Sequence, residues 1–232
     1  MNDIPPTREG IGLDASGAPE SLNPPRQARS RATLERILTA TRTLLEEREF
    51  ADITVDDIVQ GASSSKGSFY HRFADKEALL VHLLREEHEA ATRAWTETLA
   101  VERWEGRAAQ DLLDAFIDHL LGIYSRRAPL MRAYAGSLSL GAEEVRALSG
   151  RLNRHVLAQL RAALASTADG AAHPDPARAT AFVVTALLAL MPALFLGADA
   201  DLVPEPLPRD VLEQEIRRLV RRYLLRGDEH GA

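Results

Sequence analysis

The sequence predicts an all-α fold in which a small N-terminal head of three helices precedes a larger helical body, with about nine helices in total. Apolar residues recur at intervals of three and four positions along most of the chain, as they do on one face of a helix. No stretch shows the sustained alternation of apolar and polar residues that is typical of strands. Short breaks rich in glycine, proline and small polar residues separate the helical stretches.

The composition fits a globular protein. Of the 232 residues, 45% are hydrophobic, which is enough for a sizeable core. The chain has no cysteine, so disulfides and thiolate metal sites are excluded, and we expect a cytoplasmic protein without a metal or other cofactor. The amino terminus also lacks the positively charged start and the apolar run of a secretion signal.

The charge is unevenly distributed. A net charge of −6 argues, taken alone, against a protein that binds nucleic acid. However, residues 26–42 hold five arginines against one acidic residue, Glu35. A basic entry segment on a weakly acidic body suits a protein that grips DNA at one end.

We predict that residues 1–28 form a disordered leader, because they hold five of the 12 prolines and show no apolar periodicity. Arg26, Arg29 and Arg31 at its end fit either a basic arm on DNA or a solvated tail. A first helix is predicted from Thr33 to Arg48, since its apolar positions follow a helical period. The head would then comprise residues 29–76 and the body residues 77–232.

Two short helices joined by a polar turn are predicted between Thr54 and Phe73. Thr54 can cap the first of them, with Asp57 three residues on to complete a capping box. Ser65 can cap the second, and its apolar residues Phe69 and Phe73 lie four apart on one face. The side chains left on the outward face are cationic, hydroxyl or phenolic: Lys66, Ser68, Tyr70, His71 and Arg72. Such groups can meet phosphates and base edges, so the unit is predicted to be a helix-turn-helix.

Three segments of this region resemble the DNA-binding signature of TetR-family transcriptional regulators. They are Ile53-Thr-Val-Asp-Asp-Ile-Val59, Ser65-Lys-Gly-Ser-Phe-Tyr-His-Arg-Phe73 and Asp75-Lys-Glu-Ala-Leu-Leu80. The resemblance covers roughly residues 33–84. It departs at the turn, where the family usually has Ala-Gly-Val-Ser and this chain has Ala62-Ser-Ser-Ser65. A serine at position 63 is disfavoured if that residue must adopt a left-handed conformation.

The resemblance implies a homodimeric, sequence-specific regulator, most often a repressor, that a small-molecule effector releases from a near-palindromic operator in double-stranded DNA. It is not expected to be an enzyme. Carried over to this chain, the resemblance and the exposed face together give these candidate DNA contacts: Thr54, Ser65, Lys66, Gly67, Ser68, Tyr70, His71, Arg72 and Lys76. Lys66 and Lys76 would meet phosphates, and Gly67 would allow close approach of the DNA backbone.

The body shows further helical stretches. Asp75 is predicted to cap a long fourth helix, and a wide apolar stripe from Leu112 to Tyr124 is expected to end at Arg126-Arg-Ala-Pro129. Another long helix is predicted from Val145 to Leu164. We expect a mostly apolar effector in a pocket formed by inward-pointing residues, with two histidines as possible polar anchors: Trp95, Phe116, His119, Tyr124, Met131, Tyr134, His155 and Phe182. Each of these residues fits plain core packing about equally well.

The last two helices are expected to form the dimer contact, through residues 175–226. Residues 181–198 carry no charge, which falls at the lower edge of a membrane span. Thr185, Pro192 and the all-helical context favour burial against a second subunit instead. The alternative function is an all-helical protein-interaction or membrane-associated scaffold. A small all-α enzyme fits less well, since the sequence offers no catalytic constellation or histidine cluster for a metal.

Overall fold

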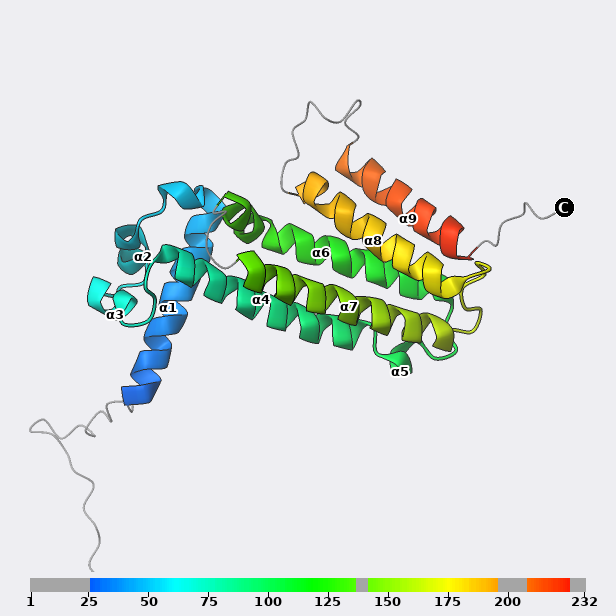
Figure 1. Cartoon of the computed structure of the whole chain (residues 1–232), viewed down its shortest axis with the longest axis horizontal. Coiled ribbons are helices and arrows are strands. Elements are labelled where there is room, and N and C mark those ends of the chain that lie inside the picture. The colour runs from blue at the N-terminus through cyan, green and yellow to red at the C-terminus, as the bar shows by residue number, and fades with distance from the viewer. Residues whose placement is uncertain (1–25, 137–141, 196–207, 226–232) are drawn as a thin grey trace, which may run out of the picture.

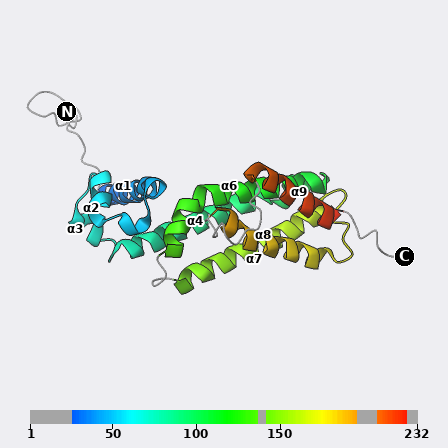
Figure 2. The ribbon, with the colours of Figure 1, turned by 90° about the horizontal axis from the view of Figure 1, so that it is seen from above.

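The computed structural model describes residues 26–136, 142–195 and 208–225, and these are all helical apart from short connections. The prediction of an all-α fold is confirmed, since the described residues form helices and no strand. In chain order they are α1 Arg26–Glu47, η1 Phe50–Asp52, α2 Val55–Gly61, α3 Lys66–Tyr70, α4 Lys76–Thr98, α5 Val101–Trp104, α6 Ala109–Gly136, α7 Ala142–Ser166, α8 Pro176–Phe195 and α9 Arg209–Leu225. The molecule is elongated, with α1 to α3 at one end and α8 and α9 towards the other (Figures 1 and 2).

The first helix begins earlier than the sequence indicated. α1 starts at Arg26, so residues 26–28 are helical rather than part of a disordered leader, and residues 1–25 lie outside the described part of the chain. Arg29 and Arg31 are therefore exposed on the first turns of a helix that projects from the head (Figure 1). Arginine and alanine are good helix formers, which accounts for the extension without an apolar stripe.

The core of the head forms where α1, α2, α3 and the start of α4 meet. Its fully buried side chains include Ile37, Ile58 and Phe69. The end of α6 also packs here, through Leu130 and Ala133. Because the head core draws on helices from both sides of residue 76, the boundary between head and body stays a prediction.

The turn between α2 and α3 is strained at one residue. Ser63 has a φ of 46°, the left-handed conformation that disfavours any residue with a Cβ. Its backbone N–H still donates to the Gln60 carbonyl at 3.1 Å, which holds the turn closed. A serine in place of a glycine at this position therefore costs stability, although the turn still forms.

Ser63→Gly is expected to raise the free energy of unfolding by about 1 kcal/mol, because glycine adopts this conformation without a steric penalty. Urea denaturation followed by circular dichroism measures the effect. Ser64→Gly is the matched control, since Ser64 is not in the left-handed region, and it should be neutral or destabilising. A Ser63→Gly variant no more stable than the parent contradicts the strain.

The body core lies between α4, α6, α7, α8 and α9. α4 contributes to both cores: Leu80 and Leu84 pack in the head, whereas Ala91 and Trp95 pack in the body. The ion pairs Arg217–Asp118 and Arg221–Asp114 fasten α9 to α6.

The break expected at Pro129 is not found. α6 runs from Ala109 to Gly136 with Pro129 inside it. Proline removes one backbone hydrogen bond, normally accepted by the carbonyl four residues earlier, and Ser125 at that position is exposed to water. The residues after the proline, Leu130 and Ala133, bury their side chains in the head core. This packing keeps the chain helical past the proline.

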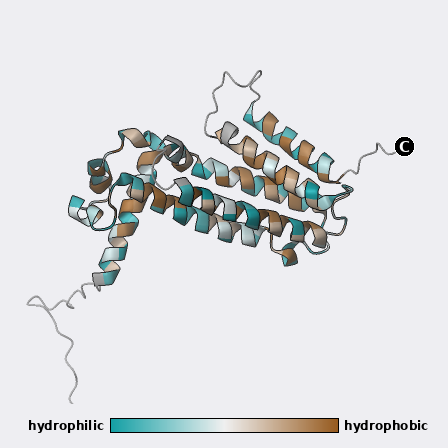
Figure 3. Cartoon of the chain, in the orientation of Figure 1, coloured by the Kyte–Doolittle hydropathy of each residue, from teal (hydrophilic) through white to brown (hydrophobic). Residues whose placement is uncertain are grey.

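An apolar stripe on α8 faces solvent. Phe182 and Leu190 on this helix are exposed, as is Leu219 on the neighbouring α9. Colouring by hydropathy shows α8, which lies next to α9 in this view, as a largely apolar helix (Figure 3). In the part of the chain that the structure describes, no helix combines the length and hydropathy needed to span a bilayer.

Candidate nucleic-acid interface and interior pocket

Local interactions fix the orientation of α3. The Ser65 side chain caps the helix by accepting a hydrogen bond from the Ser68 backbone N–H at 3.1 Å, as predicted. Phe69 is fully buried and packs edge-on and tilted against the rings of Tyr70 and Phe73, at centroid distances of 5.4 and 5.6 Å. With Phe69 pointing inward, the opposite face of α3 is turned to solvent.

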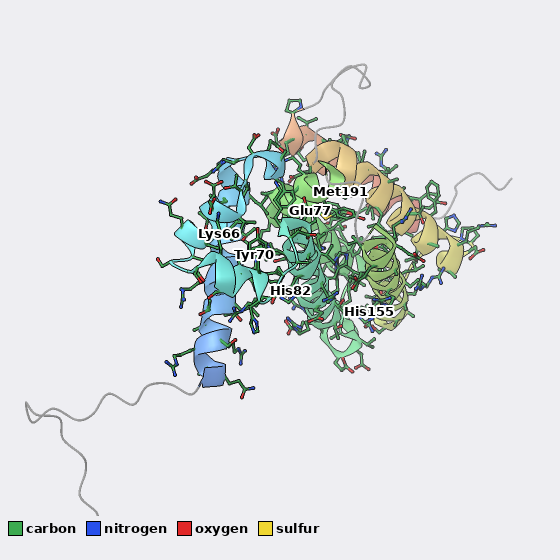
Figure 4. All side chains as sticks on the ribbon, turned by 60° about the vertical axis from the view of Figure 1, so that its left-hand side comes forward. Lys66, Tyr70, Glu77, His82, His155 and Met191 are labelled. Carbon is green, nitrogen blue, oxygen red and sulfur yellow. The ribbon has the colours of Figure 1, made fainter. Side chains whose placement is uncertain are left out.

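Four of the candidate DNA contacts form this outward face: Lys66, Gly67, Tyr70 and His71. The Tyr70 side chain is 55% exposed, which is unusual for so large an aromatic residue. Lys66 makes an exposed ion pair with Asp56 of α2 at 2.8 Å, and the hydrogen bond to Asp56 raises the pKa of the Lys66 ammonium. Such a pair is weak in water, so a phosphate can replace the carboxylate at little cost. Lys66 and Tyr70 both lie at the far end of the molecule from α8 (Figure 4).

Gly67 is not required by the fold. The nearest atom to a Cβ added at this position is the Ser65 hydroxyl oxygen, at 3.9 Å, an ordinary contact distance. Its φ lies outside the left-handed region, so no conformational need explains the glycine either. An exposed glycine on a short helix leaves room for another molecule to approach the helix backbone.

Thr54 begins α2 with a capping box, as predicted. Its hydroxyl accepts from the Asp57 N–H at 3.2 Å and donates to the Asp57 carboxylate at 2.7 Å. Hydrogen bonds from the Thr54 hydroxyl and N–H, with a further one from Arg48, lower the pKa of the Asp57 carboxyl to about 2. Thr54 is exposed, but its hydroxyl is already engaged in capping α2.

Two further candidates hold the head together in this structure. Arg72 donates to the carbonyl and the hydroxyl of Ser30 in α1, at 3.1 and 2.8 Å, and to the Ser68 carbonyl. Lys76 donates to the carbonyls of Phe50, Ala51 and Ile53, at 2.9 to 3.2 Å.

An ammonium group has three protons, so Lys76 is saturated by these carbonyls. Its Nζ also lies 4.6 Å from the centre of the Phe50 ring. These contacts explain a cation at the start of α4, where the helix dipole disfavours it. A phosphate at Lys76 would have to displace one carbonyl.

A cavity of about 90 Å³ lies in the body between α4, α6, α7 and α8. Its walls are mostly apolar, and four of the predicted pocket residues line it: Trp95, Phe116, Tyr124 and Met131. Pockets that hold drug-sized ligands are roughly 300–1,000 Å³, so this one takes a small ligand or widens when a larger one binds.

The other four predicted pocket residues lie elsewhere. The His119 ring packs against Trp95 and contacts the Thr98 hydroxyl at 3.2 Å, and the His155 ring contacts the Thr96 hydroxyl at 2.8 Å on an outer groove. Tyr134 packs against the head core. Phe182 does not point inward, since it is 58% exposed and its ring makes a tilted contact with that of Tyr223 of α9.

The polar lining of the cavity was missed by sequence reasoning. It consists of His88, Arg127, Ser149 and Asn153. His88 lies at helical spacing within the apolar stripe of α4, which could have revealed that it points inward. Arg127 belongs to the Arg126-Arg-Ala-Pro129 segment, for which the sequence predicts a helix end. Its inward direction follows only from the continuation of α6. No group of histidine and acidic residues suited to a metal is found among the described residues.

Two family profiles match the chain. The profile described as "Bacterial regulatory proteins, tetR family" matches residues 37–83, and the one described as "Tetracyclin repressor-like, C-terminal domain" matches residues 110–224. The chain belongs to the TetR family. The first match covers the helix-turn-helix and the start of α4. The second covers α6 to α9, which include the exposed stripe and three of the four helices around the cavity.

Relatives of this TetR-family chain match it over a short stretch. The HTH-type transcriptional regulator EthR of Mycobacterium tuberculosis is 50% identical over 48 residues, which are 21% of this chain and 22% of EthR. The uncharacterized HTH-type transcriptional regulator YwcC of Bacillus subtilis is 38% identical over 58 residues, 25% of this chain and 26% of YwcC. The matches thus span about a quarter or less of these relatives.

Solved structures share the fold over most of the chain. The reduced form of NemR from E. coli matches with a TM-score of 0.58 and 23% identity, over 83% of this chain and 97% of NemR. The regulator PfmR from Thermus thermophilus matches with a TM-score of 0.54 and 22% identity, over 84% of this chain and 100% of PfmR. At this level of identity the likeness concerns the fold alone.

Proposed function

We propose that this TetR-family chain is a dimeric transcriptional repressor that binds a near-palindromic operator and leaves it when a small molecule occupies the body cavity. The observation that carries the DNA-binding part is the outward face of α3. Lys66, Gly67, Tyr70 and His71 are exposed there, and the fold makes no use of the missing Cβ at position 67. As a regulator that acts on DNA, the protein would work in the cytoplasm, and no catalytic role is proposed.

The proposed division of labour follows the two cores. Residues 29–76 would read DNA, with Thr54, Ser65, Ser68, Arg72 and Lys76 supporting the exposed face or joining it at phosphates. Residues 77–232 would bind the effector and the partner subunit. Dimerisation is proposed through residues 175–226, because Phe182, Leu190 and Leu219 present apolar surface that a second copy would bury.

α4 is the proposed link between ligand and DNA. Leu80 and Leu84 fix one end of this helix in the head core, while His88 and Trp95 line the cavity. A ligand that shifts the cavity walls would tilt α4 and change the spacing of the two heads in a dimer. A ligand acts in this way only if it binds one of the two arrangements of the heads more tightly than the other. DNA must then weaken ligand binding by the same factor by which the ligand weakens DNA binding.

Gly67→Ala tests the DNA-binding face. Alanine is the better helix former and meets no clash within the protein, so the variant should be as stable as the parent or up to about 1 kcal/mol more stable. Its affinity for DNA should nevertheless fall roughly tenfold, because a methyl group blocks the approach of the DNA backbone. Fluorescence anisotropy with 30-base-pair duplexes of random sequence at low salt measures the affinity.

Gly150→Ala is the control for this experiment. Gly150 lies within α7, away from the head, and an added Cβ comes no closer than 3.4 Å to the Arg154 side chain. This variant should change helix stability in the same direction and leave DNA binding unchanged. Equal DNA affinities of Gly67→Ala and the parent would show that α3 does not contact DNA.

A further inference from the structure

One corner of the body cavity carries a positive charge without a balancing acid. Arg127 reaches it from α6, beside His88 of α4 and Ser149 and Asn153 of α7. Among the described residues, no carboxylate lies within the 4.0 Å that defines an ion pair with the Arg127 guanidinium. Its buried Nε–H also has no hydrogen-bond acceptor in the described ranges.

The polar contact that Arg127 makes with His88 is a poor one. Its Nη2 lies 3.2 Å from Nδ1 of His88, and the same Nδ1 lies 2.7 Å from the Leu84 carbonyl oxygen. A carbonyl can only accept, so the shorter contact requires a proton on Nδ1, and Nε2 then accepts from the Ser149 hydroxyl at 2.9 Å. In this tautomer His88 offers Arg127 an N–H rather than a lone pair, so His88 cannot serve the guanidinium as an acceptor.

Nearby charges do not relieve this situation. Glu87 is the acidic residue that most favours the charge on Arg127, but its carboxylate lies 3.7 Å from the Arg42 guanidinium. Burial lowers the pKa of Arg127, although a guanidinium stays charged at neutral pH. The pKa of His88 is also lowered, first by burial and then by Arg127 and Arg151, so His88 is neutral and the corner remains cationic.

A half-buried arginine without an acidic partner is costly and calls for one. The guanidinium fork matches the two oxygens of a carboxylate, and Ser149 and Asn153 add polar groups beside it. Trp95, Phe116 and Leu187 on the adjacent walls provide an apolar surface for the rest of a ligand.

We propose that the cavity binds an amphipathic organic anion, whose carboxylate pairs with Arg127 and whose apolar body lies against Trp95 and Phe116. This inference rests on the proposed effector role of the cavity and narrows the ligand from a mostly apolar molecule to a carboxylic acid with an apolar chain or ring.

The first test needs no ligand. Arg127→Met removes the charge and leaves a flexible apolar side chain that is two atoms shorter, so it should raise the melting temperature of the ligand-free protein by a few degrees. Arg126→Met is the matched control, since Arg126 is exposed next to it on α6, and it should change the melting temperature little. A lower melting temperature for Arg127→Met alone would mean that Arg127 supports the fold and would overturn the proposal.

The second test measures ligand class by titration calorimetry. The probes are straight-chain carboxylates from butanoate to decanoate and the alcohol of each length. The parent and Arg126→Met should bind at least one carboxylate ten or more times more tightly than its alcohol, and Arg127→Met should lose this preference. Alcohols that bind as tightly as carboxylates throughout, a preference that survives in Arg127→Met, or no binding of any carboxylate would each overturn the proposal.

Anisotropy of labelled duplex DNA in the same titrations separates this inference from the proposed function. A carboxylate that binds through Arg127 but leaves DNA binding unchanged supports the ligand class and contradicts the effector role. Release of DNA by the alcohols and not by the carboxylates supports the effector role and contradicts the ligand class.

Discussion

Leu219→Arg is expected to turn a dimer into a monomer and to lower operator affinity by roughly two to four orders of magnitude. Leu219 is 65% exposed on α9, close to the apolar stripe of α8 that holds Phe182 and Leu190. A charge placed in the proposed interface would be buried without a partner. A monomer also loses the second half-site, whose binding is effectively intramolecular in a dimer.

Light scattering at micromolar concentration measures the mass of the parent and the variant. Gln214→Arg introduces the same charge on α9 in the groove lined by Arg217 and Arg218, and this control should stay dimeric. A monomeric parent, or a Leu219→Arg variant that still dimerises, would place the subunit contact elsewhere.

Phe69→Ala is expected to lower the stability of the head by about 3–5 kcal/mol, the usual effect of removing a phenyl ring from a core. The ring is fully buried and touches those of Tyr70 and Phe73, so its loss leaves a cavity in the head core. Both tryptophans, Trp95 and Trp104, are buried in the body core. On heating, helical circular dichroism should therefore begin to fall before tryptophan fluorescence changes.

Tyr70→Ala provides the contrast on the neighbouring residue. Because Tyr70 is exposed, this variant should keep its stability within about 0.5 kcal/mol of the parent yet bind DNA more weakly. If Tyr70→Ala unfolds the head or Phe69→Ala leaves it intact, the assignment of inward and outward faces of α3 is reversed.

Local patterns predicted the features that depend on neighbouring residues. The helix caps at Thr54, Ser65 and Asp75 are local, because each side chain accepts a hydrogen bond from the backbone N–H three residues later. The inward direction of Phe69 follows from helical spacing alone. The all-helical fold needed no more than such periodicity.

Features that depend on distant contacts could not be predicted in this way. Lys76 is held by carbonyls 23 to 26 residues away, and α6 continues through Pro129 because residues beyond it pack in the head core. The direction of Arg127 into the cavity can be predicted only once the continuation of α6 past Pro129 is known. The packing of α4, α6 and α7 around His88 is likewise a tertiary feature. The helical periodicity of the sequence does not tell which helices pack together.

Selection from a library of randomised DNA duplexes tests most directly whether the protein is a dimer that reads DNA with α3. The selected sequences should be inverted repeats, with half-site centres separated by about one helical turn, 10–10.5 base pairs, or a multiple of it. The parent should select them and Tyr70→Ala should not. Recovery of single, asymmetric sites, or no enrichment over the starting library, would contradict a dimeric repressor of this kind.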